Sequence, residues 1–220
     1  MTRFITDHII PRLNSAGAFF AYLGLRLILA WEFWEAGTTK LKGNNWFSNV
    51  QDNFPFPFSM FSADTNWVLA AYGEVIFALL ILFGLFTRFA ALSLIIITAV
   101  ATAAVHWPES WGSLSELWQG YAISNDGNGN FKLPLIFIVM ALPLVFNGAG
   151  KISLDHLISK YLKQPENKTV CDIATIGAAF TVFGLTLVFV MPTTGLILIG
   201  LGLAAIIYQF FASNKPSQAD

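Results

Sequence analysis

The sequence predicts an all-α integral membrane protein, and three properties of the chain lead to that fold class. Hydrophobic residues make up 55% of its 220 residues, and charged residues make up only 11%. A soluble domain of ordinary composition has about 25% charged residues. The mean hydropathy is +0.63. The apolar residues also gather into long segments, and a helix needs about 20 such residues to cross the hydrocarbon core.

Six segments are predicted to span the membrane, four in a bundle and two in a C-terminal hairpin. They cover residues 16–37, 67–86, 88–106, 132–147, 170–190 and 193–212. The fourth is short and carries Pro134 and Pro143, and Met191-Pro192 separates the last two. The expected organisation is a four-helix membrane bundle over 1–160, a cytoplasmic linker over 161–169, a transmembrane hairpin over 170–212 and a disordered tail over 213–220.

The basic residues predict the orientation of these spans. With the N-terminus in the cytoplasm, eight Lys and Arg residues fall on the inner side and only Lys40, Lys42 and Lys132 on the outer side. The positive-inside rule therefore favours an N-in, C-in topology. The loops 38–66 and 107–131 then lie outside. A net charge of -1 implies no attraction to nucleic acid, and the single Cys171 excludes an internal disulfide.

Two charged residues lie inside predicted spans. Arg26 is in the first span and Glu74 in the second, and such a charge near the bilayer centre costs about 3 kcal/mol. A rise of about 1.5 Å per residue puts the two within about 6 Å in depth, in the outer half of the membrane. We therefore predict a buried Arg26–Glu74 pair, with Lys40 and His106 above it at the outer mouth.

Further residues complete this predicted polar site. Glu32 lies near the same depth on the first span, three residues before Glu35. The predicted aromatic walls are Trp31, Phe33, Trp34, Trp107 and Trp111. Two alternatives stay open: the charges bind a ligand, proton or cofactor, or they only fix helix register. No metal is predicted, because the Glu-x-x-His pairs of di-iron bundles are missing. The sequence has no flavin or haem motif.

Five sequence segments together suggest a family. They are RLILAWEFWEAGTTKL at 26–41, FPFPF at 54–58, GEVIFALLILFGLFTRFAAL at 73–92, AVHWP at 104–108 and FNGAGKISLDHLI at 146–158. Through them the chain resembles, over about residues 16–160, the DoxX family of small bacterial inner-membrane proteins. HWP and GTTKL are similar to the HvfX-type branch, which is associated with the maturation of metal-binding modified peptides.

The resemblance implies a four-helix bundle in the bacterial inner membrane. Its polar positions would be Arg26, Lys40, Glu74, Arg88 and His106. Family members are linked to sulfur and thiol redox chemistry and to oxidative stress. The DoxD relatives form part of thiosulfate:quinone oxidoreductase. The final hairpin lies outside the usual four-span core of the family.

Three functional hypotheses follow from the residues and the resemblance. The first is a quinone-linked redox subunit, in which Arg26 or His106 donates to a quinone carbonyl and Glu74 relays a proton. The second is a non-enzymatic accessory or anchor for a redox, metal-stress or peptide-maturation partner. The third and least favoured is a small-solute transporter, because no internal repeat is evident. The sequence leaves open whether the chain is itself an oxidoreductase, and whether it forms a homo-oligomer.

Overall fold

The computed structural model of the chain describes residues 2–108, 110–119, 129–165 and 170–213. Within these ranges every element of regular secondary structure is a helix, so the predicted all-α class is confirmed. Residues 166–169 of the predicted linker and 214–220 of the predicted tail lie outside the described residues.

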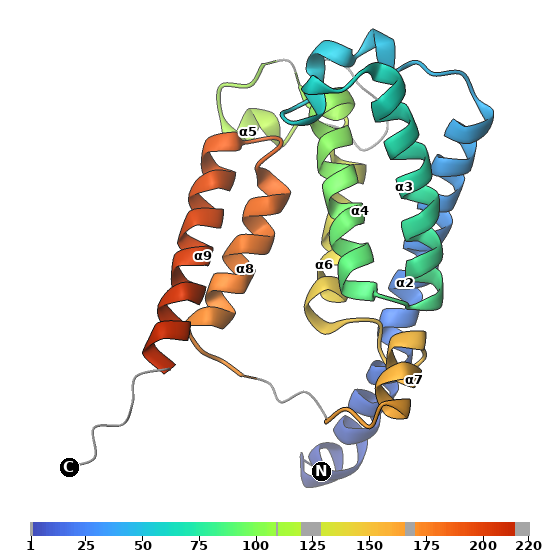
Figure 1. Ribbon diagram of the computed structural model, residues 1–220. Helices are drawn as coiled ribbons and strands as arrows, with labels where there is room; N and C mark the ends of the chain where they lie inside the picture. The colour runs from blue at the N-terminus through green and yellow to red at the C-terminus, as the bar shows by residue number, and fades with distance from the viewer. Residues whose placement is uncertain (1, 109, 120–128, 166–169, 214–220) are drawn as a thin grey trace. The chain divides into compact units, whose positions relative to one another are not determined.

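Four helices form the first of two units, which runs from Met1 to Gln164 (Figure 1). They are α2 (Ile10–Lys42), α3 (Ala63–Phe83), α4 (Thr87–Ala101) and α6 (Lys132–Asn147). Each of α2, α3, α4 and α6 packs against the next, and α6 packs back on α2, so that the four close into a ring. The bundle core contains fully buried Leu29, Ile81, Leu94, Ile95 and Leu144.

Short helices flank and connect the four bundle helices. They are α1 (Thr2–Phe4), η1 (Ile5–Ile9), η2 (Phe47–Asn49), η3 (Gln51–Asn53), η4 (Phe58–Met60), η5 (Thr102–His106), α5 (Leu114–Leu117) and α7 (Leu154–Tyr161). The π-helix η5 continues α4 directly, and η2, η3 and η4 lie in the connection between α2 and α3.

The second unit, from Pro165 onward, contains a helical hairpin of α8 (Ile173–Leu187) and α9 (Pro192–Ser213). Glycines allow the two backbones to approach closely. A Cβ at Gly177 would lie 2.6 Å from the Gly202 carbonyl oxygen, and one at Gly184 would lie 2.8 Å from that of Gly195. Small residues at a helix–helix contact are typical of membrane packing.

In the part of the chain that the structure describes, four helical segments are long and apolar enough to cross a membrane: Ile5–Lys42, Ala63–Phe83, Thr87–His106 and Pro192–Ala212. The helices α6 and α8 are also apolar, but they have 16 and 15 residues. At about 1.5 Å per residue they measure about 22–24 Å, against a hydrocarbon core of about 30 Å. A helical membrane protein is therefore supported, and the count of six spans stays a prediction.

Close packing at Gly37 sets the register between α2 and α3. A Cβ at this position would lie 2.7 Å from Cγ2 of Val75 and 2.9 Å from the carbonyl oxygen of Ala71. The helix that contains the predicted first span, 16–37, is longer than that span at both ends, because α2 begins at Ile10 and ends at Lys42. With the helix extended past Gly37, its last turn lies beside the N-terminal half of α3.

Arg26 joins three parts of the bundle at the end where α3 stops, which we call the arginine end. Its Nε donates to the Ile81 carbonyl oxygen at 2.8 Å, and its Nη2 donates to that of Leu82 at 2.6 Å. Its Nη1 donates to the carbonyls of Ala149 and Ile152 at 3.1 and 2.5 Å. The last carbonyls of a helix lack partners within the helix, so a guanidinium with five N–H donors satisfies them well.

Two more charged side chains complete the arginine end. The Asp155 carboxylate accepts from the backbone N–H of Phe86 at 2.8 Å and of Thr87 at 2.9 Å, which caps the start of α4. Arg88, in the first turn of α4, donates to the carbonyls of Val145 and Phe146 at the end of α6. Each charge therefore meets the helix end of opposite polarity, an arrangement that the helix dipole favours.

The glycine contact predicts a position-specific loss of stability. Gly37→Ala is expected to lower the free energy of unfolding by about 1–3 kcal/mol, because the added methyl group overpacks the α2–α3 contact. Gly24→Ala is the matched control, because a Cβ at Gly24 meets nothing within 4 Å. Thermal unfolding in detergent would measure both variants, and equal stabilities would contradict the proposed register contact.

The contacts of Arg26 predict a larger effect. Arg26→Leu is expected to cost about 3 kcal/mol or more, because one hydrogen bond to a charged group is worth about 1.5–3 kcal/mol. Arg26→Lys should recover only part of this, since an ammonium lacks the planar fork. Exposed Arg12 on α2, which donates to the His8 carbonyl of η1, is the control, and Arg12→Leu should cost under about 0.5 kcal/mol. Unfolding in mixed micelles, followed by circular dichroism, would measure all three.

Candidate functional site

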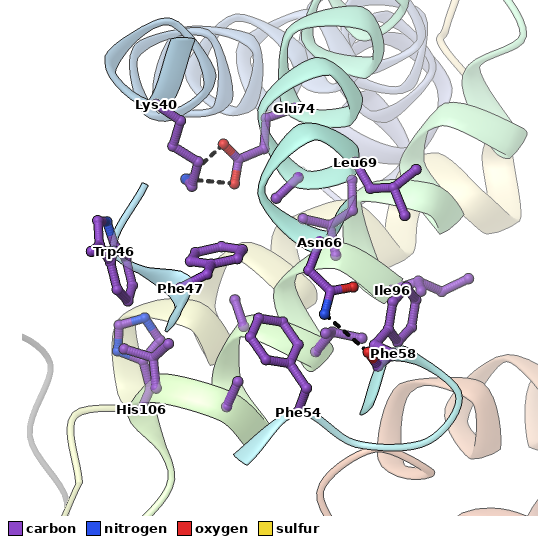
Figure 2. A pocket seen from close by; sticks show the side chains of 16 residues that line it. Lys40, Trp46, Phe47, Phe54, Phe58, Asn66, Leu69, Glu74, Ile96 and His106 are labelled. Atoms are coloured by element: carbon purple, nitrogen blue, oxygen red, sulfur yellow. Dashed lines mark hydrogen bonds and ion pairs between the residues drawn. The ribbon is translucent and has the colours of Figure 1, made fainter. Parts of the chain in front are cut away.

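A pocket lies at the opposite end of the bundle, which we call the loop end (Figure 2). It has a volume of about 150 Å³ and lies among the end of α2, the connection 43–62, the first half of α3, and α4 with η5. The residues that line it are Lys40, Trp46, Phe47, Phe54, Phe58, Asn66, Leu69, Ala70, Glu74, Ile96, Ile97, Val100, Ala101, Ala104, Val105 and His106.

Side-chain amides hold the connection 43–62 over this pocket. Nδ2 of Asn45 donates to the Asp64 carboxylate at 2.7 Å, and Nδ2 of Asn66 donates to the Phe58 carbonyl at 2.9 Å. Nδ2 of Asn53 reaches the Ala104 carbonyl of η5 at 3.4 Å. The connection is thereby tied to both α3 and η5, and its aromatic residues form one wall.

An ion pair lies in the pocket wall. Nζ of Lys40 is 2.9 Å from Oε1 and 2.8 Å from Oε2 of Glu74, so one ammonium binds both carboxylate oxygens. Glu74 is buried, with 6% of its surface exposed. Lys40 comes from the last turn of α2 and Glu74 from the middle of α3. A charge-assisted pair of this kind is stronger than a neutral hydrogen bond.

The predicted Arg26–Glu74 pair is wrong. Arg26 binds the carbonyl of Ile81, which lies seven residues beyond Glu74 on α3, or about 10 Å along the helix. The first span was predicted to leave the membrane at Gly37, whereas α2 continues to Lys42 and brings Lys40 to Glu74 instead. Arg26 belongs to the arginine end and does not line the pocket.

His106 is brought to the same pocket as Lys40 and Glu74, as the sequence predicted for these three residues. It is the last residue of η5, and its Nδ1 is 2.7 Å from Oδ1 of Asn130. The backbone N–H of Asn130 also donates to the His106 carbonyl at 3.0 Å. The imidazole is therefore held in one orientation by the segment that precedes α6.

Glu32 was predicted to join the polar site, but the structure places it elsewhere. It is exposed on α2, as is Glu35, and neither lines the pocket. Within the described ranges, no group of three or more His, Cys, Asp or Glu residues could hold a metal ion.

The predicted aromatic walls also differ from those observed. Trp31 and Trp34 are exposed on the outside of α2, where they line a separate groove against α3. Phe33 is buried against Phe137, with ring centroids 5.8 Å apart. Trp107 packs on Trp111, and none of these five predicted residues lines the pocket.

The observed wall consists of aromatic residues that the sequence argument had not assigned to the site. Trp46, Phe47, Phe54 and Phe58 all come from the connection 43–62. Phe47 is buried, and its ring centroid is 5.2 Å from that of Phe54 and 5.0 Å from that of Trp67. The available signal was the FPFPF run together with the Trp46-Phe47 pair, directly after the span that carries Lys40.

Asn66 is a polar pocket residue that the sequence argument missed. It lies in the first turn of α3, where Ser62 is the N-cap, and only 2% of its surface is exposed. Its Nδ2 donates to the Phe58 carbonyl, whereas its buried Oδ1 has no hydrogen-bond partner among the described residues. A polar residue on an otherwise apolar helix is an insufficient signal without this geometry.

Fold and site together define a helical membrane bundle with an aromatic pocket and a buried ion pair at one end. The DoxX family model matches residues 21–107. A Haemophilus influenzae protein described as uncharacterized is 44% identical over 149 residues, which cover 68% of this chain and 90% of that protein. No solved structure matches the chain. The chain belongs to the DoxX family and is a bacterial membrane protein.

The revised pairing predicts which residues are energetically coupled. In a double-mutant cycle of Lys40→Met and Glu74→Gln, we expect a coupling energy of about 0.5–3 kcal/mol, as for residues in direct contact. A cycle of Arg26→Lys and Glu74→Gln should give less than about 0.5 kcal/mol, because these residues share no contact. Unfolding free energies in mixed micelles supply both values. The opposite ranking would restore the pairing that the sequence suggested.

Proposed function

We propose that this chain is a six-span inner-membrane protein, N-in and C-in, whose loop-end pocket binds the ring of a quinone-type ligand in a redox system. The observation that supports this best is the pocket itself, with a volume of about 150 Å³ and four aromatic side chains in its wall. An apolar cavity of about that volume holds a benzene ring. Under the proposed topology the pocket lies in the outer half of the membrane.

The polar residues of the pocket suit such a ligand. Aromatic rings pack favourably against one another in offset or edge-to-face geometry, which Phe47, Phe54 and Trp46 can offer to a quinoid ring. In the pocket wall Glu74 provides a carboxylate that can carry a proton, and Lys40 is its ion-pair partner. In this proposal Glu74 relays a proton. Of the two residues predicted to contact a ring oxygen, Arg26 or His106, only His106 lines the pocket and takes that role.

The source of electrons lies outside the chain in this proposal. The sequence has no flavin or haem motif, so a substrate or a partner protein would supply the electrons. The resemblance to the DoxD relatives, which form part of a quinone-linked oxidoreductase, also supports a role beside a partner that supplies electrons. The chain would then act as the quinone-binding subunit of an oxidoreductase.

A non-enzymatic accessory or anchor role is the second proposal, and a surface feature favours it. Glu32 and Glu35 are exposed on α2, a helix long and apolar enough to cross a membrane. The groove lined by Trp31 and Trp34 lies on the same helix. Carboxylates on a membrane-crossing surface favour contact with a partner over contact with lipid. A redox or peptide-maturation protein recovered by crosslinking at Glu32, and lost in Glu32→Leu, would support this role.

Quinone binding gives the direct test of the first proposal. Purified protein in nanodiscs, with Cys171→Ser to prevent thiol addition, should bind 2,6-dimethyl-1,4-benzoquinone saturably, as followed by quenching of tryptophan fluorescence. Ala101→Phe should weaken binding at least about tenfold, because the new ring fills the pocket that Ala101 lines. Leu79→Phe is the matched control, because Leu79 lines the separate groove. Non-saturable quenching, or equal affinity in Ala101→Phe and Leu79→Phe, would contradict the proposal.

A further inference from the structure

We infer that the pocket prefers the reduced, hydroxyl-bearing form of its ring ligand, and that Asn66 is a specificity-determining residue for this preference. This inference deepens the proposed function and rests on it. The reason is an excess of hydrogen-bond acceptors over free donors in the pocket wall. A quinone offers only carbonyl acceptors, whereas a hydroquinone offers two O–H donors.

The amide of Asn66 provides the first acceptor. Its nitrogen is engaged by the Phe58 carbonyl at 2.9 Å, which fixes the orientation of the amide and identifies Oδ1 as the remaining atom. In Figure 2 the nitrogen is turned toward Phe58 and the oxygen is turned away from it. Oδ1 is buried without a hydrogen-bond partner in the part of the chain that the structure describes. A buried acceptor without a partner is costly, so a ligand hydroxyl that donates to it gains affinity.

His106 provides a second acceptor. Its Nδ1 faces Oδ1 of Asn130 at 2.7 Å, and because an amide oxygen only accepts, we assign the ring hydrogen to Nδ1. In the neutral imidazole Nε2 then carries the lone pair and accepts. The wall residue His106 therefore suits a ligand O–H, and it would repel a ligand carbonyl placed at the same position.

The strong donor of the wall, the Lys40 ammonium, uses two of its three N–H groups on Glu74, and the indole N–H of Trp46 is the other donor among the lining residues. Lys40 directs its ammonium to both oxygens of Glu74, at 2.9 and 2.8 Å. A carboxylate has about four lone-pair sites, so Glu74 can accept a further hydrogen bond from a ligand. The third Lys40 N–H and the Trp46 indole N–H are therefore the donors left for a ligand. The acceptors are the oxygen of Asn66, the ring nitrogen of His106 and the remaining lone pairs of the Glu74 carboxylate, and they outnumber the donors.

This preference would change the redox properties of the bound ligand. Reduction of a quinone adds two electrons and two protons and converts both carbonyls to hydroxyls. If the hydroquinone binds tenfold more tightly than the quinone, the potential of the bound couple rises by about 30 mV. The pocket would thus favour the direction in which electrons pass to the quinone.

The test compares the two forms of one ring. Wild-type protein in nanodiscs, with Cys171→Ser and without oxygen, is titrated with 2,6-dimethylhydroquinone and with 2,6-dimethyl-1,4-benzoquinone. We expect the hydroquinone to bind at least about tenfold more tightly, because the wall has more acceptors for a hydroxyl than donors for a carbonyl. In Asn66→Leu the ratio should fall by at least about fivefold.

Gln51 offers a matched control for this variant. Its Nε2 donates to the Phe61 carbonyl at 2.8 Å, and its buried Oε1 has no partner within the described residues. Like Asn66, it donates to a backbone carbonyl of the connection 43–62 and has a buried oxygen without a partner in the described part of the chain, but it does not line the pocket. Gln51→Leu should therefore leave the ratio unchanged, and a loss of preference in both variants would assign the effect to the loop rather than to Asn66.

The outcomes separate this inference from the proposed function. Equal binding of the two forms, or tighter binding of the quinone, overturns the inference and leaves the proposed function standing. If neither form binds, the proposed function itself fails. If Asn66→Leu does not fold, p-cresol and 4-methylanisole are compared on the wild type, since only the first has an O–H donor. Tighter binding of 4-methylanisole, or equal binding, would overturn the acceptor argument.

Discussion

The contact on which the rest of the bundle depends is the one between the Arg26 guanidinium and the backbone at the arginine end. Its three nitrogens reach carbonyls at the end of α3 and in the segment 149–152, which lie far apart in the sequence. A charge in an apolar bundle is stable when polar groups surround it. Here the carbonyls of Ile81 and Leu82 in α3 and of Ala149 and Ile152 after α6 surround the guanidinium, without an ion-paired carboxylate among the described residues.

This contact also determines what happens at the loop end. Once Arg26 is level with Ile81 and Leu82, the antiparallel course of α2 and α3 brings the last turn of α2 beside Glu74. The close approach at Gly37, where an added Cβ would meet Ala71, Glu74 and Val75, maintains the same register at the level of Glu74. The ion pair in the pocket wall is therefore a consequence of the structural charge at the other end, about two helical turns away along α3.

Each end has a buried side-chain oxygen without a partner among the described residues, Oγ1 of Thr87 at the arginine end and Oδ1 of Asn66 at the loop end, but of these two residues only Asn66 lines the pocket. At the arginine end Arg26, Arg88 and Asp155 bind the free backbone groups of helix termini. At the loop end a buried amide oxygen lacks a partner next to an aromatic pocket. Proteins depart from local consistency mainly at functional sites. The contrast supports a structural role for the first end and a binding role for the second.

The sequence by itself determined that this is a helical membrane protein and that its buried charges matter, because hydropathy and the cost of buried charge are properties of residue type. It also brought Lys40, Glu74 and His106 to one site. Only the tertiary structure decided which charge meets which. A shift of a few residues at the end of α2 changes the partner of Glu74 from Arg26 to Lys40, and composition does not encode that register. The pocket wall and Asn66 likewise depend on how the connection 43–62 folds back, which involves contacts between distant segments.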